Sequence, residues 1–449
     1  MLNVPDLPSA FPALRGSLHN VADTIRRLVA GATVPPGAWP AGFADQLESA
    51  ALHGVELLVP VIAPLKAGKS TLINAILGET ILPTRPLPST YLPTRVVFGH
   101  TAAGAQPLLE LSSATTHTVR ALITALTEAL ANGTTTYPPP VDGLVDRLRR
   151  GGSIVFPQRR RGATAISGVL TELNDVVRLA VQVLSAKGIA IPTMEQPQVY
   201  APGDSLPFPS STGIPIVLVD MPSTDDATST PFIATHLAEQ LGRAHAVILV
   251  VDYSRLSNQA ASVINHALQP FVDLLGPTAL WPVVNRVDQR RCDNDLDADG
   301  VRRLLTHTLA LDDPTRIVEV SAEQGLVARG YLRALARCQP GTYPSDKATA
   351  ALLRTIYPTE QHSRNPGPEQ LTGLAGQLLT VSGMPELFAN VLMPLFRDAV
   401  STSWRATLAR LQAGGKELAG RGSDLTEFTD RVADLAWRIS RLEAADHDR

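Results

Sequence analysis

One run, LLVPVIAPLKAGKSTLINAILG at Leu57–Gly78, constrains the fold and chemistry of this chain more than any other feature. An apolar strand pattern leads into a tight loop, and a helical pattern begins after Gly68. That order directs backbone N–H groups and a helix N-terminus at an anion, which is the geometry of a triphosphate-binding P-loop. Lys69 is expected to reach the β- and γ-phosphates and Ser70 to bind Mg²⁺.

The loop departs from the usual G-x-x-x-x-G-K-[ST] pattern at its first position, where Ala63 replaces glycine. Alanine has the smallest side chain with a Cβ, so the backbone can still approach a phosphate, although a positive φ becomes costly. We therefore expect phosphate binding to be retained. A chance match within a strand–turn–helix is the alternative.

Composition indicates a globular protein with 44% apolar and 18% charged residues. The net charge is -3, with acidic and basic residues mixed along the chain, so neither a nucleic-acid groove nor a polybasic membrane segment is expected. Cys292 and Cys338 lie far apart, so no disulfide framework is expected. No signal peptide and no run of about 18 apolar residues is evident, which predicts a cytoplasmic protein with at most peripheral contact at the inner face of the cell membrane.

Further strand patterns occur at Arg95–Phe98, Ile214–Val219, Ala246–Val251, Leu280–Val284 and Arg316–Val320. Most are near-continuous apolar runs that alternate with helical patterns, which is typical of strands buried on both faces of a parallel sheet. The sequence thus predicts an α/β, doubly wound, mostly parallel fold with ligand groups at the carboxyl ends of its strands.

Two strand ends carry candidate ligand groups. The strand over Ile216–Val219 ends at Asp220, which is placed to hold Mg²⁺ opposite Ser70. In the usual D-x-x-G pattern the last residue is glycine, but here it is Ser223, which keeps the N–H and restricts the turn. A strand-terminal aspartate that only caps a helix is the alternative.

The strand pattern Leu280–Val284 runs into the pattern N-R-x-D at Asn285, Arg286 and Asp288. An aspartate at this position accepts hydrogen bonds from N1–H and the N2 amine of guanine, which adenine does not offer, so GTP is favoured over ATP. Arg286 replaces the usual lysine, and its aliphatic stem is expected to cover the base. Ser321 and Ala322 follow a later strand and supply the second base-contacting loop.

A threonine is also needed in the loop between the P-loop helix and the second strand. Thr90 is the candidate, with Thr94 as second choice. A hydroxyl on Mg²⁺ and an N–H on the γ-phosphate would order this loop only in the triphosphate state. The alternative is that these threonines only form local turns.

The runs KAGKSTLINAILG, ILPTRPLPSTYLPT, DMPST, NRVD and SGMPEL resemble the dynamin superfamily, particularly bacterial dynamin-like proteins. The resemblance covers roughly Leu57 to Leu395. It implies a G domain that dimerises across its nucleotide face, which stimulates hydrolysis, and a bundle formed by helices from both chain ends. Members generally continue into a stalk with a lipid-binding tip, and this chain ends at Arg449, too early for such a stalk.

The resulting domain prediction places N-terminal bundle helices at 1–55, a G domain at 56–395, and C-terminal bundle helices, the start of a stalk, at 396–449. Within the G domain we expect a helical insertion at about 100–213 and a mobile insertion at about 339–369. The residues Phe428, Val432, Leu435, Ile439 and Leu442 follow a heptad pattern. They predict either packing against the N-terminal helices or a self-association seam.

Hydrolysis of GTP needs positive charge where negative charge develops between the β- and γ-phosphates, and Lys66 is the candidate to supply it. At this position the resemblance implies either an arginine finger or a residue that helps to hold a monovalent cation, K⁺ or Na⁺. An exposed lysine without a role is the alternative. The switch segment Ser223–Thr230 has no glutamine, so backbone groups would orient the water, as the resemblance also implies. The catalytic candidates are Lys66, Lys69 and Thr90, and the metal candidates are Ser70, Thr90 and Asp220 with Mg²⁺. The nucleotide-binding candidates are Ala63, Lys66, Ala67, Gly68, Lys69, Ser70, Thr71, Asn285, Arg286, Asp288, Ser321 and Ala322.

Two functions fit these observations. The first is a Mg-dependent GTPase whose GTP or GDP state controls homodimerisation through the G domain and assembly or membrane remodelling. The second is a signalling switch that binds an effector in chromosome or cell-division processes without remodelling membranes. A chain truncated before its stalk, or one half of a paired system in which a partner dynamin-like subunit supplies the stalk, is a further possibility. No nucleic-acid partner is expected.

Overall fold

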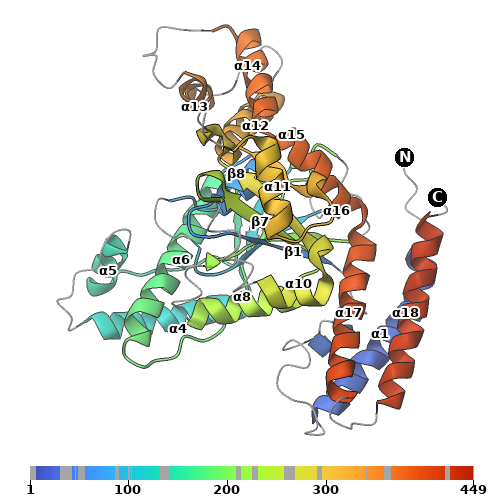
Figure 1. Cartoon of the computed structure of the whole chain (residues 1–449). Helices are drawn as coiled ribbons and strands as arrows, with labels where there is room; N and C mark the ends of the chain where they lie inside the picture. The colour runs from blue at the N-terminus through green and yellow to red at the C-terminus, as the bar shows by residue number, and fades with distance from the viewer. Residues whose placement is uncertain are drawn as a thin grey trace.

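Figure 1 shows the computed structural model of the chain. The structure describes residues 7–30, 43–45, 47–48, 56–85, 90–99, 102, 104–131, 141–208, 214–224, 231–256, 268–290, 296–339, 342, 344, 346–357, 366–419 and 425–447. Helical patterns predict helices at Phe43–His53 and Ser257–Leu275. Parts of both fall outside the described residues, as does Cys292. Cys338 carries a free thiol.

The core of the fold is a nine-stranded sheet in the order β4-β3-β5-β2-β6-β1-β7-β8-β9. Five of its eight strand pairs are parallel, so the predicted mostly parallel sheet is confirmed. The strands are β1 (Leu57–Ile62), β2 (Thr94–Phe98), β3 (Leu108–Glu110), β4 (Arg159–Arg161), β5 (Gln198–Tyr200), β6 (Ile216–Asp220), β7 (Val247–Asp252), β8 (Leu280–Asn285) and β9 (Val318–Val320).

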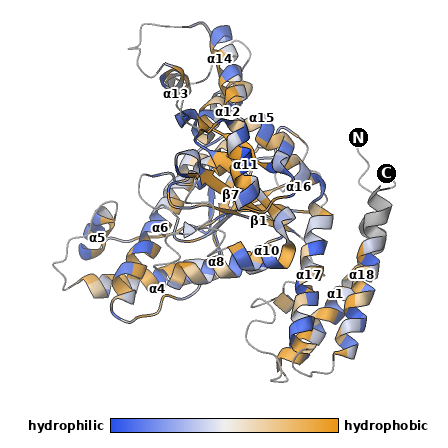
Figure 2. Ribbon diagram, in the orientation of Figure 1, coloured by the Kyte–Doolittle hydropathy of each residue, from blue (hydrophilic) through white to orange (hydrophobic). Residues whose placement is uncertain are grey.

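Helices cover both faces of the sheet, and β1 shows why. Its alternate side chains point to opposite faces, so Val59 joins the apolar cluster that contains α3 and α6, whereas Leu58 joins the cluster that contains α8, α10 and α11. Figure 2 shows the strands around β1 and β7 as mainly hydrophobic. These helices are α3 (Lys69–Leu77), α6 (Ala163–Ser185), α8 (Pro231–Arg243), α10 (Gln269–Leu275) and α11 (Ala298–Thr308).

The first insertion contains the predicted helices, α4 (Ser113–Leu130), α5 (Asp142–Arg149) and α6. It also contains strands β3, β4 and β5, which extend the sheet beyond β2 and were not predicted. Each of these strands is three residues long. A run this short carries little alternation, so tertiary pairing rather than local pattern defines it.

The second insertion also holds a helix that was not predicted. Helix α13 (Asp346–Ile356) packs against α12 (Ala322–Ala336) and α14 (Pro368–Val381) around the buried side chains of Tyr331 and Leu352. Part of this insertion is therefore regular structure with its own small apolar cluster.

An apolar stripe at helical spacing predicts one long helix over Pro385–Leu411, kinked at Pro394, and this helix is divided in the structure. A π-helical segment, Phe388–Leu392, separates α15 (Met384–Leu387) from α16 (Met393–Arg397). Pro394 lacks an N–H and its ring would clash with the preceding turn, and a wider π turn relieves both problems. A second break falls at Asp398, whose carbonyl accepts the Thr402 N–H as α17 (Ala399–Ala419) begins.

Helices from both chain ends form the predicted bundle beside the sheet (Figure 1). Helix α18 (Thr426–His447) packs on α1 (Leu7–Ala30) and on α17. The heptad residues Phe428, Val432, Leu435 and Ile439 are buried in the same cluster as Leu14 and Leu18 of α1. The seam is therefore satisfied within the chain.

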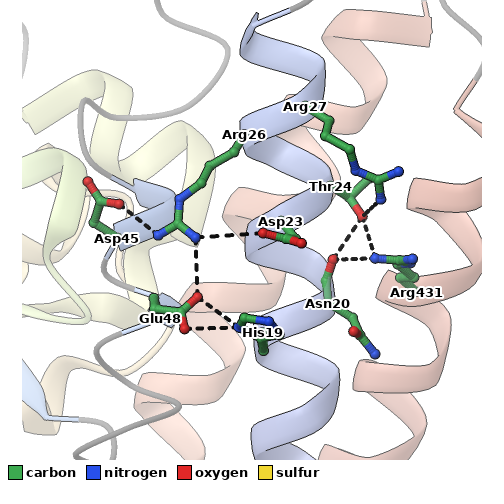
Figure 3. Close-up of polar contacts among 9 residues, drawn as sticks. All are labelled: His19, Asn20, Asp23, Thr24, Arg26, Arg27, Asp45, Glu48 and Arg431. Carbon is green, nitrogen blue, oxygen red and sulfur yellow. Dashed lines mark hydrogen bonds and ion pairs between the residues drawn. The ribbon is translucent and has the colours of Figure 1, made fainter.

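Polar contacts join these helices around the apolar seam (Figure 3). Arg431 of α18 donates to the Asn20 carbonyl at 2.6 Å and to Thr24 Oγ1 at 2.9 Å. Arg26 of α1 lies 2.8 Å from Asp45 and 3.3 Å from Glu48. The contacts of Arg431 hold α18 against α1, and the contacts of Arg26 hold the helical residues 43–45 and 47–48 against α1.

Among the described residues, no single helix has the length and hydropathy needed to cross a bilayer. One pair of helical segments, Pro368–Val381 and Met384–Arg397, reaches them only together, with a 55° bend between the two.

Arg410 connects the bundle to the sheet. This buried α17 side chain donates from Nε to the Gly242 carbonyl at 2.6 Å and from Nη2 to the Ala244 carbonyl, at the end of α8. Burial lowers the pKa of the Arg410 guanidinium to about 10. Next to it, burial holds the pKa of His245 well below its usual value, and its neutral Nδ1 accepts the Leu58 N–H at 2.9 Å.

We expect Arg410→Ala to lower the free energy of unfolding by about 3 kcal/mol, because two buried helix-end carbonyls lose their donor. Exposed Lys416 lies on the same helix, and Lys416→Ala should change the free energy of unfolding by less than about 0.5 kcal/mol. Urea unfolding followed by circular dichroism measures both. Equal unfolding midpoints for the two variants would show that Arg410 is not a structural connection.

Candidate nucleotide-binding site

Asp220 is the centre of the candidate site. Its Oδ2 accepts hydrogen bonds from Ser70 Oγ at 2.8 Å and from Thr90 Oγ1 at 3.1 Å. Lys69 Nζ lies 3.5 Å from Asp220 Oδ1. Four residues that sequence analysis selected independently, from three separate segments, thus meet at one carboxylate.

Sheet register explains this convergence. Strands β1 and β6 run parallel with Val61 opposite Asp220, so the P-loop leaves the sheet at the same edge as Asp220. Strand β2 is antiparallel to β6 with Thr94 opposite Asp220, so β2 begins where β6 ends. The loop containing Thr90 is therefore delivered to the P-loop.

The P-loop backbone depends on Gly68. This residue has a φ of 89°, and a Cβ placed on it would lie 2.2 Å from Asn285 Nδ2. Both conditions exclude other residues. Ala63 does not have a left-handed φ, so its Cβ causes no backbone strain. This explains why alanine can replace the usual glycine at this position. Lys66 does have a left-handed φ of 66° and is exposed.

Asn285 links the P-loop to the second base-contacting loop. Its Nδ2 donates to the Ala67 carbonyl at 2.8 Å, and its Oδ1 accepts the Ala322 N–H at 2.9 Å. The Ser321 N–H in turn donates to the Ser382 carbonyl at 2.8 Å, which anchors this loop to the α14–α15 corner. Asn285 therefore positions the backbone of the P-loop and of the second base-contacting loop, because its amide nitrogen and its amide oxygen each make a hydrogen bond to one of them.

Arg286 and Asp288 separate into different roles. Arg286 has a φ of 66°, and its Nη1 lies 2.8 Å from Oδ2 of buried Asp252 at the end of β7. The guanidinium is thus held by the neighbouring strand. Asp288 follows in a short 3-10 turn, Val287–Gln289, and is exposed, so its carboxylate is accessible to a ligand.

The donor set at Asp220 suits Mg²⁺. Among the described residues no cluster of three or more His, Cys, Asp or Glu could hold a metal, so any ion here would rely on few protein ligands. Asp220 Oδ1 is buried without a hydrogen-bond partner in the described part of the chain. Mg²⁺ typically takes one or two carboxylates with phosphate and water, and Ser70 and Thr90 add hydroxyls.

Sequence analysis missed two asparagines that position this site. Asn174 of α6 accepts the Tyr91 and Leu92 N–H groups at 2.6 and 3.1 Å, which fixes the loop next to Thr90. Asn74 of α3 accepts the Ile81 and Leu82 N–H groups at 3.0 and 2.8 Å. Both are buried amides in otherwise apolar helix faces, which is the signal that could have revealed them.

Comparison with known proteins agrees with these observations. Residues 59–271 match the model of the dynamin family. The Clamp-binding protein CrfC of Escherichia coli is 30% identical over 402 residues, which cover 84% of this chain and 50% of that protein. The same protein from Escherichia coli strain K12 is 29% identical over 400 residues, again 84% and 50%. The chain therefore spans about half the length of the curated relatives it matches.

Solved structures of an oligomerised bacterial dynamin pair, described as sensing and tethering membranes over long range, also match. One has 14% sequence identity and a TM-score of 0.34, covering 100% of this chain and 67% of that one. A second has 14% identity and a TM-score of 0.32 with the same coverage.

The family model begins within β1 and ends within α10, so it contains the P-loop, Thr90 and Asp220, which meet in the site. Over residues 59–271, which include this site, the chain is therefore similar to the dynamin family.

Proposed function

We propose that this chain binds and hydrolyses GTP with Mg²⁺ at the site centred on Asp220. The observation that carries the proposal is the convergence of Ser70, Thr90 and Lys69 on Asp220 Oδ atoms within 3.5 Å. A carboxylate with only a structural role needs one strong partner, whereas the Asp220 carboxylate has three. All three partners come from segments that would contact a bound triphosphate.

Different groups of the protein would bind the phosphates, bind Mg²⁺ and supply positive charge. Backbone N–H groups of Ala67–Thr71 at the α3 N-terminus would hold the phosphates, and Lys69 would turn from Asp220 to the β- and γ-oxygens. Ser70, Thr90 and Asp220 would hold Mg²⁺, which neutralises charge that develops between the β- and γ-phosphates. Lys66 would add positive charge or help to hold K⁺ or Na⁺, and its left-handed backbone supports a functional constraint.

Base selection would rest on Asp288, with Arg286, Ser321 and Ala322 around it. Ala322 lies in place because Asn285 holds its N–H. Asp288 would accept two hydrogen bonds from guanine, and adenine would leave its carboxylate unpaired.

The bound nucleotide, GTP or GDP, would control homodimerisation through the G domain. The accompanying movement of the G domain would be transmitted to the helical bundle. The segment after Asp220 leads into α8, and Arg410 of the bundle holds the carbonyl end of α8. A shift of α8 on hydrolysis would therefore act directly on α17. Assembly, a partner dynamin-like subunit and a cytoplasmic position with peripheral membrane contact belong to the same proposal.

The test is GTP turnover across a range of protein concentrations. Turnover per molecule should rise as concentration rises and then level off, because dimerisation completes the catalytic arrangement. Constant turnover per molecule at all concentrations would exclude control by dimerisation while leaving GTP hydrolysis itself intact.

A second candidate is an effector-binding switch in chromosome processes. The name of the Escherichia coli relatives, Clamp-binding protein, favours it, and the matched region covers 84% of this chain. Pull-down of the purified clamp for which the Escherichia coli relatives are named, in GTP and in GDP, separates the two: nucleotide-dependent capture without concentration-dependent turnover would favour the switch.

A further inference from the structure

The segment that joins α5 to the edge of the sheet differs in charge from the rest of the chain. Residues 142–161 hold six arginines and two aspartates, a net charge of +4, while the whole chain has a net charge of -3. Sequence analysis expected no basic membrane segment because the average charge hides this local excess. Residues 147–161 are called the arginine-rich segment below.

The segment ends in β4 (Arg159–Arg161), the outermost strand of the sheet. All three β4 residues, Arg159, Arg160 and Arg161, are exposed. Arg159 Nε lies 2.9 Å from Glu110 Oε1, yet its side chain remains 77% exposed. The side chains of Arg160 and Arg161 make no ion pair or hydrogen bond with any residue that the structure describes. Two guanidinium groups are therefore available to anions.

Between α5 and β4, the arginine-rich segment has an exposed apolar side chain, Val155, with arginines on both sides of it in the sequence. Val155 is 74% exposed, the most exposed of the large hydrophobic residues on the described surface. Its neighbours Ile154 and Phe156 pack against the core, which holds Val155 outward. On the α5 side Arg149 and Arg150 are exposed, and the Arg150 side chain, 3.5 Å from Asp146, is 79% exposed.

We propose that the arginine-rich segment docks this chain peripherally on an anionic lipid bilayer. Guanidinium groups of β4 and of the α5 end would pair with lipid phosphates, and Val155 would enter the interface between headgroups and acyl chains. Charge on an edge strand also prevents strand pairing, but that role does not require an outward Val155. A nucleic acid would supply phosphates and prefer an aromatic stacking group, whereas the outward residue here is aliphatic.

The full chain is sedimented with vesicles of phosphatidylglycerol and phosphatidylcholine, with phosphatidylcholine vesicles and with duplex DNA, each at low and high salt. The test variant is Arg159→Gln/Arg160→Gln/Arg161→Gln, and its matched control replaces exposed Arg302, Arg303 and Arg397 with glutamine. We expect the test variant to bind anionic vesicles at least about tenfold more weakly, the control to bind normally, and high salt to weaken binding of the unaltered chain.

Val155→Ser keeps the charge and separates lipid from nucleic acid. It should weaken vesicle binding about threefold at any salt concentration and leave DNA binding unchanged. Absence of binding to anionic vesicles, equal binding by the test and control variants, or DNA binding with no vesicle effect of Val155→Ser would overturn the proposal. GTP turnover without vesicles should be the same in all variants, so this outcome is independent of the nucleotide site.

Discussion

Lys69→Ala is expected to lower GTP turnover about a thousandfold, the largest effect of any single change in this chain. The ammonium group lies 3.5 Å from Asp220 Oδ1 and sits at the start of α3, where phosphates would bind. Alanine keeps the helix intact and removes only the charge that would stabilise the transferring phosphoryl group. Phosphate release at saturating GTP measures the change.

Lys347 provides the control for Lys69, because it is an exposed lysine on α13, outside the site. Lys347→Ala should keep full turnover, and both variants should unfold at the same temperature as the unaltered chain. Loss of turnover in Lys69→Ala accompanied by early unfolding would instead point to a structural lysine. Full turnover in Lys69→Ala would place hydrolysis somewhere other than this P-loop.

Asp288→Ala is expected to weaken GTP binding by a factor of about 10² to 10³. The carboxylate is exposed at the edge where β8 and β9 end, and its loss would remove the two charge-assisted hydrogen bonds proposed for guanine. ATP affinity should not change, so the preference for GTP should disappear. Titration with labelled GTP and ATP gives both affinities.

The matched variant for Asp288 is Asp312→Ala, which removes an exposed carboxylate from the turn after α11. It should leave both affinities unchanged. If the unaltered chain bound ATP as tightly as GTP, the assignment of Asp288 to guanine would be wrong, whatever the variants did.

Strand identity and strand ends could be read from the sequence because they are local. Apolar runs such as Ile216–Val219 are buried on both faces wherever the chain places them, and the polar residue that ends each run must lie at the sheet edge. Asp220 and Asn285 were found in this way, and the structure places both at the edge with the P-loop. The pairing of the heptad residues with α1 was one of two predictions, and burial beside Leu14 decided it.

Other features carried no local signal. Strand β4 is three arginines, which have no tendency to form a strand, and it exists because β3 offers it an antiparallel partner. Asn174 stands in an apolar helix face, and its function depends on a loop 82 residues away in the chain. From residue type alone, Arg410 would be expected on the exposed face of a helix. It is buried because α17 packs against the end of α8.

The sequence by itself determined which residues are available for the proposed chemistry: a loop suited to phosphates, a carboxylate and hydroxyls suited to Mg²⁺, and an aspartate suited to guanine. These follow from residue type and order, since short motifs fix their own backbone geometry. Only the tertiary structure decided how these groups are held and to what they are connected. Contacts such as Asn174 to Leu92 and Arg410 to Gly242 join residues far apart in the chain, and chain folding alone brings such partners within hydrogen-bonding distance.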